Sequence, residues 1–319
     1  MPGIATPSIC YPLGRVEARQ LHQSSGAPLD EVLNITRCDG FPALGEGEQS
    51  WELAASAARD LLRREGIAPD QISHVIYAGT GCWDRPFWSP SAKIAQAIGI
   101  HGAHCFEVTN FCNAAWTAIN LACDKLDSGR ADLVLVVTAD QLSRLVDRDS
   151  ADSLSLFNFG DAAAAVLVKR GGERYRLLHS AMRTDPGWVD YYAGAWRDGK
   201  VRVERQPHRR GLAQAYLDNF ALLVQRTLDA LGRSLAEVRY LLINHGDEDM
   251  HRSLLARLDL SEERTVFNYH RLGHMGSADT LIALEQLERE QQLQAGDLIL
   301  LASSAMGFSW GITAVEYQA

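Results

Sequence analysis

Short apolar runs that end at or near glycine recur in the two halves of the chain and predict buried strands that lead into loops. The first pair is ISHVIYAGTG (72–81) and VRYLLINHG (238–246). A second strand-like run follows each of them, FEVTNF (106–111) and TVFNYH (265–270). Both halves are therefore predicted to contain two strands in the same order.

Each second run leads into a segment of small residues in which apolar positions recur at helical spacing. These two segments are CNAAWTAINLACDKLDSG (112–129) and HMGSADTLIALEQLEREQ (274–291). Both halves then continue with a buried strand behind an aspartate and a closing strand. The four runs are ADLVLVVTAD (131–140), DAAAAVLVKR (161–170), GDLILLASSA (296–305) and WGITAVEY (310–317).

The matching order of elements predicts an α/β fold made by duplication. We expect two pseudo-symmetric α/β halves, residues 1–170 and 171–319, with mainly parallel sheets covered by helices. The helix that starts at Cys112 and the helix that starts near His274 are then equivalent, and we expect them to lie close together. A cleft is expected at the C-terminal ends of the strands, where such folds place their chemistry.

Composition excludes several classes of protein. A net charge of −9 argues against a general nucleic-acid binder, which needs a basic face. We interpret the one basic cluster (202–210) as a solvated loop, with contact to an acidic partner as the alternative. The sequence contains no run of about 18 apolar residues and no secretory signal, so neither a membrane span nor export is predicted. The six cysteines form no CxxC pair, which predicts no metal site and suits a reducing cytoplasm.

Cys112 stands at the start of a predicted helix, where cysteine is not a favoured capping residue. A helix N-terminus carries partial positive charge and unpaired N–H groups, and both stabilise a thiolate. The amide of Cys112 can also point at the oxygen of a bound thioester, as an oxyanion hole requires. This position favours a nucleophile, with a buried structural cysteine as the alternative; Cys105 and Cys123 are interpreted as structural.

Five segments occur in an order that is typical of one family. They are FEVTNFCNAAWTAINLACDKLDSGRADLVLVVTADQLSR (106–144), LFNFGDAAAAVLVKR (156–170), LLINHGDEDMHRSL (241–254), LGHMGSADTLIAL (272–284) and SSAMGFSWGITAVEY (303–317). In turn they resemble the nucleophile region, the FGDGAGAVVL strand, the HQANxR motif, the GNTSAAS helix start and the GGGLTWG ending of ketoacyl synthase III, a member of the thiolase superfamily. The resemblance spans nearly the whole chain, and it implies a five-layered, duplicated thiolase-like fold.

Catalytic roles follow from this resemblance residue by residue. It implies Cys112 as the acylated nucleophile and His245 as its histidine partner, while the family's catalytic asparagine falls on His274. A cysteine with two histidines is similar to ketoacyl synthases I and II. Two neutral imidazoles can each donate to the enolate oxygen formed when a malonyl thioester loses carbon dioxide, or one can act as a base towards an alcohol or amine.

Other positions depart from the family or have more than one interpretation. Acidic residues occupy 247–249, where the family has the asparagine of HQANxR, and an aliphatic stretch replaces its early tryptophan. Met306 and Gly307 are expected to offer a second oxyanion amide beside that of Cys112. Asp279 could orient a histidine, and Trp116 could border the pocket, although core packing is the preferred interpretation of Trp116.

The sequence thus predicts a ketoacyl synthase III-like acyltransferase in which an acyl-CoA or acyl-carrier-protein thioester acylates Cys112. Decarboxylative Claisen condensation with a malonyl thioester is the preferred second step. Acyl transfer to an alcohol or amine is the alternative, and a non-catalytic partner subunit is a third interpretation that the retained cysteine disfavours. We expect a cytoplasmic homodimer of specialised lipid or polyketide metabolism, with a CoA or phosphopantetheine thioester as substrate and no tightly bound cofactor.

Overall fold

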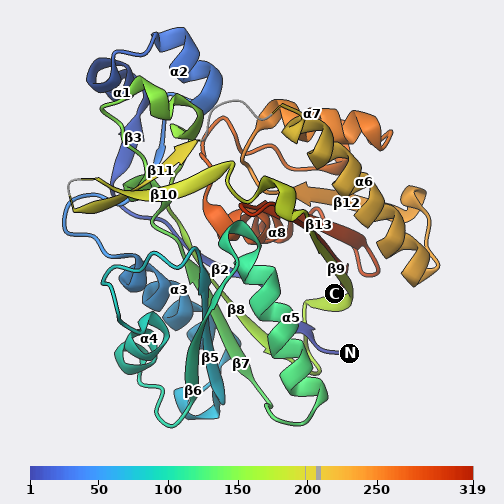
Figure 1. The fold of residues 1–319 in the computed structure, drawn as a ribbon. Helices are drawn as coiled ribbons and strands as arrows, with labels where there is room; N and C mark the ends of the chain where they lie inside the picture. Colours follow the sequence, from blue (N-terminus) through green and yellow to red (C-terminus); the bar gives the residue numbers. More distant parts are fainter. Residues whose placement is uncertain (198, 206–209, 319) are drawn as a thin grey trace.

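The computed structural model describes residues 1–197, 199–205 and 210–318 (Figure 1). Residues 206–209, which belong to the basic cluster noted above, lie outside the described residues. The helices are α1 (Ala18–Ser25), α2 (Leu29–Thr36), α3 (Ser50–Glu65), α4 (Pro90–Ile98), α5 (Ala114–Asp127), α6 (Leu212–Leu231), α7 (Glu248–Arg257) and α8 (Asp279–Arg289). The strands are β1 (Gly3–Ile4), β2 (Ser8–Cys10), β3 (Arg15–Glu17), β4 (Gly40–Pro42), β5 (His74–Gly79), β6 (His104–Thr109), β7 (Val134–Ala139), β8 (Ala163–Lys169), β9 (Tyr175–Thr184), β10 (Tyr192–Arg197), β11 (Lys200–Arg205), β12 (Val238–Ile243), β13 (Leu298–Ala305) and β14 (Ser309–Tyr317).

One ten-stranded mixed sheet runs through both halves of the chain. Its path is β12-β13-β14-β9-β1-β8-β7-β5-β6, and β2 pairs with β8. The first half repeats in the second, because β5 and β7 pair in parallel as β12 and β13 do, and β7 and β8 pair antiparallel as β13 and β14 do. The predicted duplicated α/β fold is confirmed.

The prediction of mainly parallel sheets is wrong, since most strand pairs in this sheet are antiparallel. The link between β13 and β14 consists of residues 306–308 only. A parallel crossover needs a dozen or more residues, so a link of this length forces the next strand to return antiparallel.

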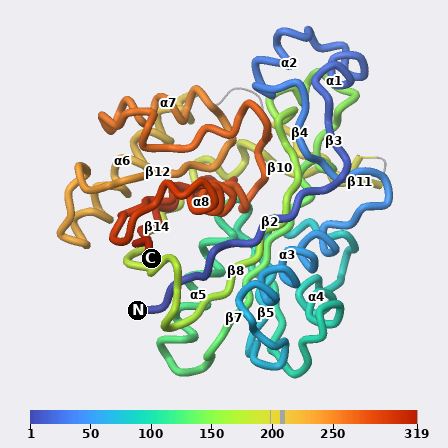
Figure 2. The backbone as a smooth tube through the Cα atoms, turned by 180° about the vertical axis from the view of Figure 1, so that it is seen from behind, coloured from blue at the N-terminus to red at the C-terminus, as the bar shows by residue number. Residues whose placement is uncertain are grey.

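Helices cover the outer faces of the sheet and lie between its two halves, which gives five layers (Figures 1 and 2). Alternate residues of a strand pack against different helices. Val75 and Tyr77 of β5 pack with the alanine-rich face of α3 and with α4, whereas Ile76 packs towards α5 and α8. In the second half, α6 and α7 cover the outer face of β12, β13 and β14. Helices α5 and α8 therefore lie in the central layer between the two sheet halves, where their N-termini can meet.

The segment 265–270, predicted as a strand, has no strand structure, and this prediction is wrong. It was expected to form the edge strand of the second half, as β6 does in the first half. In the described residues, however, β12 is the last strand at that end of the sheet. The side-chain hydroxyl of Thr265 donates to the Leu241 carbonyl at 2.5 Å, in place of a backbone ladder. Residues 268–272 turn instead, with the Leu272 N–H donating to the Asn268 carbonyl at 2.8 Å.

The two central helices begin beside each other, as predicted. Short 3₁₀ turns, Phe111–Asn113 and Gly276–Ala278, lead into α5 and α8, and the Trp116 Nε1–H of α5 donates to Thr280 Oγ1 of α8 at 2.8 Å. The boundary proposed at residues 170 and 171 stays a prediction; it falls between β8 and β9, which belong to one sheet.

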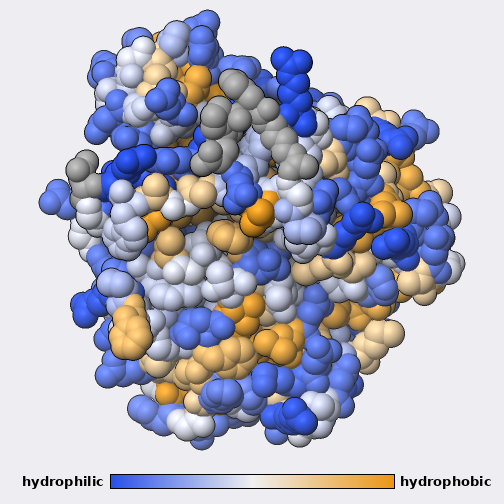
Figure 3. All heavy atoms as spheres, in the orientation of Figure 1, coloured by the Kyte–Doolittle hydropathy of each residue, from blue (hydrophilic) through white to orange (hydrophobic). Residues whose placement is uncertain are grey.

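Hydrophilic residues predominate on the face seen in Figure 3, with hydrophobic residues in small groups between them. Among the helices that the structure describes, none is both long and apolar enough to span a membrane.

Candidate active site

Cys112 lies in the 3₁₀ turn between β6 and α5, half-buried at the wall of a cavity. Phe111, the residue before it, has a φ of 47°, an unusual value for a residue with a side chain and one that costs roughly 1–3 kcal/mol. Asn113, the residue after it, is fully buried and its Nδ2 donates to Ser309 Oγ at 2.8 Å. This turn is therefore held to β14 on one side and strained on the other, which fixes where the thiol points.

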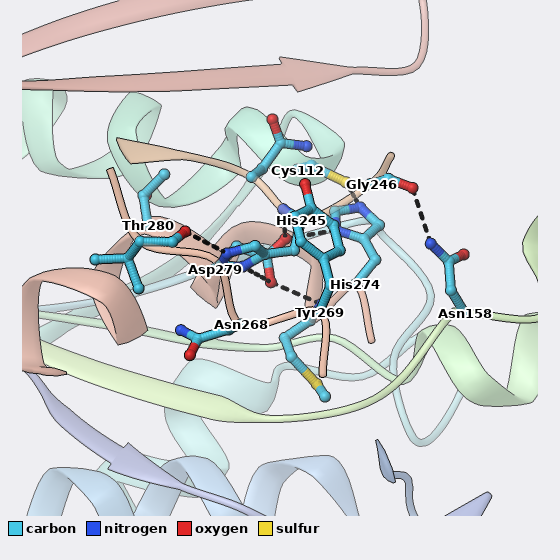
Figure 4. A network of polar contacts seen from close by, with 12 residues as sticks. Cys112, Asn158, His245, Gly246, Asn268, Tyr269, His274, Asp279 and Thr280 are labelled. Carbon is cyan, nitrogen blue, oxygen red and sulfur yellow. Dashed lines mark hydrogen bonds and ion pairs between the residues drawn. The ribbon is translucent and has the colours of Figure 1, made fainter. Parts of the chain in front are cut away.

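His274 is the histidine that contacts the thiol. Its Nε2 lies 3.0 Å from Cys112 Sγ, and its Nδ1 lies 2.6 Å from Asp279 Oδ2 (Figure 4). Because a carboxylate can only accept, Nδ1 carries the proton in this contact. Cysteine, histidine and aspartate thus form a chain of the kind that activates nucleophiles.

Asp279 is fully buried at the first position of α8. Its carboxylate accepts hydrogen bonds from the backbone N–H of His245 at 2.7 Å and of Met275 at 2.8 Å, besides His274. Burial by itself raises the pKa of this carboxyl group, but the charge of His274 and the donated hydrogen bonds outweigh it and lower the pKa of Asp279 below its usual range. The sequence had offered Asp279 only as one of two interpretations.

The contacts around His274 raise its pKa, whereas those around Asp279 lower the pKa of the carboxyl group. Burial lowers the pKa of its imidazole, but the negative charges of Cys112 and Asp279 outweigh burial and raise that pKa well above 6.5. When no acyl group is bound, the charges of Cys112 and Asp279 therefore favour the imidazolium form of His274.

His245, predicted as the partner of Cys112, points elsewhere. The Gly246 N–H donates to the Asn244 carbonyl at 2.9 Å, so His245 is at the centre of a three-residue turn. Its neighbours Asn244 and Gly246 line the cavity, whereas the ring of His245 is 1% exposed and lies 3.3 Å, through Nε2, from the Val266 carbonyl. Of the two histidines, His274 and not His245 therefore contacts the Cys112 thiol, and the catalytic role of each stays a prediction.

Asn244 is a cavity residue that the sequence interpretation missed. It follows β12 directly, and its Oδ1 accepts the Ser304 N–H at 3.1 Å. This bond identifies which atom of the amide is oxygen, so the other arm of the side chain is an NH₂ donor. The position of Asn244, a polar residue directly after a buried strand, could have indicated this. The sequence interpretation passed over it because the adjacent His245 was predicted to be the catalytic residue.

Met306 and Gly307 form the turn that joins β13 to β14. Met306 lines the cavity, while Gly307 has a φ of 133°, which favours glycine. Ala305 remains inside β13, so the alanine in this motif is not the residue that adopts a positive φ. The role of the Met306 and Gly307 amides as oxyanion donors stays a prediction.

Trp116 lies in the core rather than at the cavity. Its side chain is 1% exposed and its indole N–H is bound to Thr280. Together with the central position of α5, this agrees with the preferred interpretation of core packing. The cysteines outside the site are also governed by packing: burial raises the pKa of the Cys105 thiol and raises that of Cys123 to about 12.

The cavity beside Cys112 and His274 has a volume of about 450 Å³. Its lining includes the aromatic side chains of Tyr191, Tyr192, Tyr216, Phe220 and Phe308 and the charged side chains of Arg37, Arg205, Asp247, Glu248 and Asp249. Arg37 is paired with Asp249 at 2.6 Å. No group of three or more His, Cys, Asp or Glu side chains in the described ranges is placed to hold a metal ion.

Two family models match the chain, each described as 3-oxoacyl-[acyl-carrier-protein] synthase III. One matches residues 106–186 and the other, the C-terminal model, residues 228–317. The chain belongs to the ketoacyl synthase III-like family of the thiolase superfamily. It is accordingly an enzyme, an acyltransferase of the ketoacyl synthase III type.

Curated relatives of this ketoacyl synthase III-like chain agree with the family models. It is 28% identical over 280 residues to the β-ketoacyl-[acyl-carrier-protein] synthase III of Rhizorhabdus wittichii, with 86% of each chain covered. It is 29% identical over 285 residues to the enzyme of the same name from Gloeobacter violaceus, with 84% of each covered.

Solved structures agree in fold. The chain aligns with the 3-oxoacyl-[acyl-carrier-protein] synthase III of Aquifex aeolicus at a TM-score of 0.88 and 22% identity, covering 99% of this chain and 100% of the other. It aligns with OleA of Xanthomonas campestris at 0.88 and 17% identity, covering 99% and 97%. These likenesses support the thiolase-like fold that the sequence implied.

Proposed function

We propose that this enzyme transfers an acyl group from a thioester, through Cys112, to a hydroxyl or amino acceptor that His274 deprotonates. The observation that carries the proposal is the hydrogen bond from His274 Nδ1 to Asp279. It fixes the neutral imidazole in the tautomer whose Nε2 faces Cys112 with a lone pair, which is the form of a general base.

Acylation begins with the Cys112 thiolate and the His274 imidazolium. The sulfur attacks the thioester carbonyl and forms a new C–S bond, while the bond to the departing thiol breaks. That thiol leaves with the proton from His274 Nε2. The carbonyl oxygen carries negative charge in between, and the amide of Cys112 and an amide of the Met306–Gly307 turn would donate to it.

Acyl transfer then uses the neutral His274. Nε2 removes the proton of the acceptor as its oxygen or nitrogen attacks the acyl carbon. The new ester or amide bond forms, the C–S bond to Cys112 breaks, and the thiolate and imidazolium are restored. Asp279 keeps the ring oriented and stabilises the imidazolium.

Decarboxylative condensation with a malonyl thioester, our first choice from sequence, is the second candidate. An enolate oxygen needs hydrogen-bond donors, whereas neutral His274 offers it a lone pair. Asn244 supports this candidate, because its amide offers one donor at the cavity. The family also supports it, since the curated relatives are named as ketoacyl synthases.

Acyl-CoA and acyl carrier protein are the proposed donors, the second because the relatives' names specify acyl-carrier-protein. The substrate carries its own CoA or phosphopantetheine arm, so no tightly bound cofactor is proposed. A homodimer, a cytoplasmic location and a place in specialised lipid or polyketide metabolism stay predictions.

The test is intact-protein mass spectrometry after incubation with a panel of acyl-CoAs and acyl carrier proteins. We expect wild type, but not Cys112→Ala, to gain the mass of the acyl group. Acylated protein is then given malonyl-CoA, alcohols or amines in separate reactions. Clearance of the adduct by an alcohol or amine, with the matching ester or amide formed, supports the proposal; clearance by malonyl-CoA with release of carbon dioxide supports the second candidate. No adduct from any donor would overturn both and revive the non-catalytic subunit.

A further inference from the structure

Behind the Cys112–His274–Asp279 chain lies a second imidazole that the proposed reaction does not use. His245 Nδ1 is buried, has no hydrogen-bond partner among the described residues and lies 3.7 Å from Asp279 Oδ1. Figure 4 shows both histidines beside Asp279. The carboxylate thus lies between two imidazoles, one of which reaches the thiol.

The other nitrogen of His245 determines the protonation of the ring. Nε2 lies 3.3 Å from the Val266 carbonyl, and a carbonyl oxygen can only accept, so Nε2 carries a proton. A neutral His245 would therefore turn the lone pair of Nδ1 towards a carboxylate oxygen, which is repulsive. A proton on Nδ1 converts this contact into an attraction.

The other groups around the ring offer no competing charge. Burial, together with His245 and Arg252, lowers the pKa of His251 well below 6.5, and the His251 Nε2–H donates to Thr265. Tyr269 meets the His245 ring edge-on with centroids 5.0 Å apart, and burial raises the pKa of its hydroxyl well above 10. Both therefore stay neutral around neutral pH, and Asp279 is the charged group that His245 faces.

We propose that His245 binds a proton at Nδ1 and pairs with Asp279, acting as a positioning residue that keeps this carboxylate ionised while Cys112 is acylated. The inference rests on the proposed function, because it concerns the second step of that reaction. It explains why a buried carboxylate is flanked by two imidazoles when a triad requires one.

The acylated state is where this proton matters. Once Cys112 is acylated, His274 is neutral and Asp279 is a buried carboxylate that has lost the charge opposite it. Uptake of a proton by Asp279 would remove that uncompensated charge, but the protonated carboxyl would donate to His274 Nδ1 and move the imidazole proton to Nε2. No base would then face the thioester. A positive His245 compensates the charge and keeps Nε2 unprotonated.

The experiment follows the breakdown of the acyl-enzyme in water, so that no acceptor needs to be known. Wild type, His245→Gln and His251→Gln are acylated with acetyl-CoA or hexanoyl-CoA, freed of donor, and followed by intact mass across a series of pH values. His245→Gln keeps the backbone N–H that binds Asp279 and loses only the ring. His251→Gln is the matched control, since it removes a buried imidazole that bonds to Thr265 and Tyr269 instead.

We expect the acid limb of the pH–rate profile for acyl-enzyme breakdown to move to higher pH by about one to two units in His245→Gln. At a pH below that limb, the breakdown rate of this variant should therefore be about 10- to 100-fold lower than that of wild type. At alkaline pH its rate should converge with that of wild type, because Asp279 is then ionised without help. His251→Gln should follow the wild-type profile. A uniform loss at every pH, a wild-type profile for His245→Gln, or an equal shift in His251→Gln would overturn the inference.

A second measurement does not depend on any variant folding or any donor reacting. Alkylation of Cys112 with iodoacetamide blocks the sulfur as an acyl group does, and ¹⁵N-histidine NMR of this protein reports the protonation of each ring. We expect one buried imidazole with both nitrogens protonated and one with a bare Nε2. Two singly protonated rings beside Asp279 would overturn the inference, whereas the absence of any acyl adduct would count against the proposed function only.

Discussion

Cys112 and His274 are 162 residues apart in the chain, yet Cys112 Sγ and His274 Nε2 are 3.0 Å apart. Each residue lies just before a central-layer helix, one in each half of the duplicated fold. The contact therefore depends on how the halves pack, and it joins the proposed nucleophile to the proposed base, whose other nitrogen is bound by Asp279.

Selective alkylation should reveal this contact in the resting enzyme. At neutral pH we expect iodoacetamide to modify Cys112 first, because His274 Nε2 lies 3.0 Å from its sulfur and can take the proton of the thiol as it reacts. Burial raises the pKa of the Cys10 and Cys105 thiols, and Cys123 with a pKa of about 12 should stay unmodified. Peptide mass spectrometry over time measures the order. His274→Gln should slow only the reaction of Cys112; an equal rate at Cys10 would contradict the pairing.

Asp279→Asn should separate base catalysis from acylation. The amide can donate to His274 Nδ1, which moves the imidazole proton to Nε2 and removes the base. We expect acyl transfer to an alcohol or amine to fall by about 10⁴-fold, the order seen when a triad carboxylate becomes an amide. Single-turnover clearance of the adduct measures this.

In Asp279→Asn, His274 presents an Nε2–H donor to the substrate, whereas in the wild type its Nε2 presents a lone pair. Decarboxylation of malonyl-CoA should therefore suffer much less than transfer to an alcohol, provided the variant remains folded by circular dichroism. Equal losses in both reactions would argue against the fixed tautomer.

Asn244 should matter for condensation only. Its amide is the donor that an enolate oxygen would use, so Asn244→Ala should lower malonyl-CoA decarboxylation by about 10²-fold, the usual cost of one oxyanion donor. Ester formation should change little, because His274 and Asp279 are untouched. Carbon dioxide release and ester formation are measured on the same preparation, and a larger loss of the ester would reverse the assignment.

Trp116 and Thr280 form a matched pair for testing the core interpretation. Trp116→Phe should destabilise the protein by about 1–3 kcal/mol through the lost hydrogen bond and volume, without changing the preferred acyl-CoA. Thr280→Val removes the partner, and the double variant should cost less than the two single changes together. Urea denaturation measures stability. A shift towards longer acyl groups in Trp116→Phe would instead assign the indole to the pocket.

The His274–Asp279 pair should also set a pH window of stability. His274 has a raised pKa in the folded state, so its contribution is present below about 6.5 and is lost as the pH rises through the folded value. Asp279 has a lowered pKa, so its contribution is present above about 3.9 and is lost as the pH falls. The stability difference between wild type and His274→Gln should therefore be largest between these limits. Thermal unfolding across pH measures it, and a constant difference would exclude the ion pair.

Much of the fold could be predicted from local pattern. Apolar runs and helical spacing gave β5, β6, β7, β8, β12, β13 and β14 and the starts of α5 and α8, because strand and helix periods follow from backbone geometry. The run 265–270 has the residue pattern of a strand and was wrongly predicted as one. In the structure, the Thr265 hydroxyl bonds to β12 and the Val266 carbonyl contacts the His245 ring.

The sequence by itself determined the nucleophile candidate, the duplicated α/β fold and the place of the site, since each depends on residue type and order. Only the tertiary structure decided which histidine faces Cys112. A three-residue turn directs the His245 ring inwards and leaves Asn244 at the cavity, while a turn before α8 brings His274 to the thiol. Side-chain direction in loops depends on backbone torsions that packing sets, and residue identity alone does not encode them.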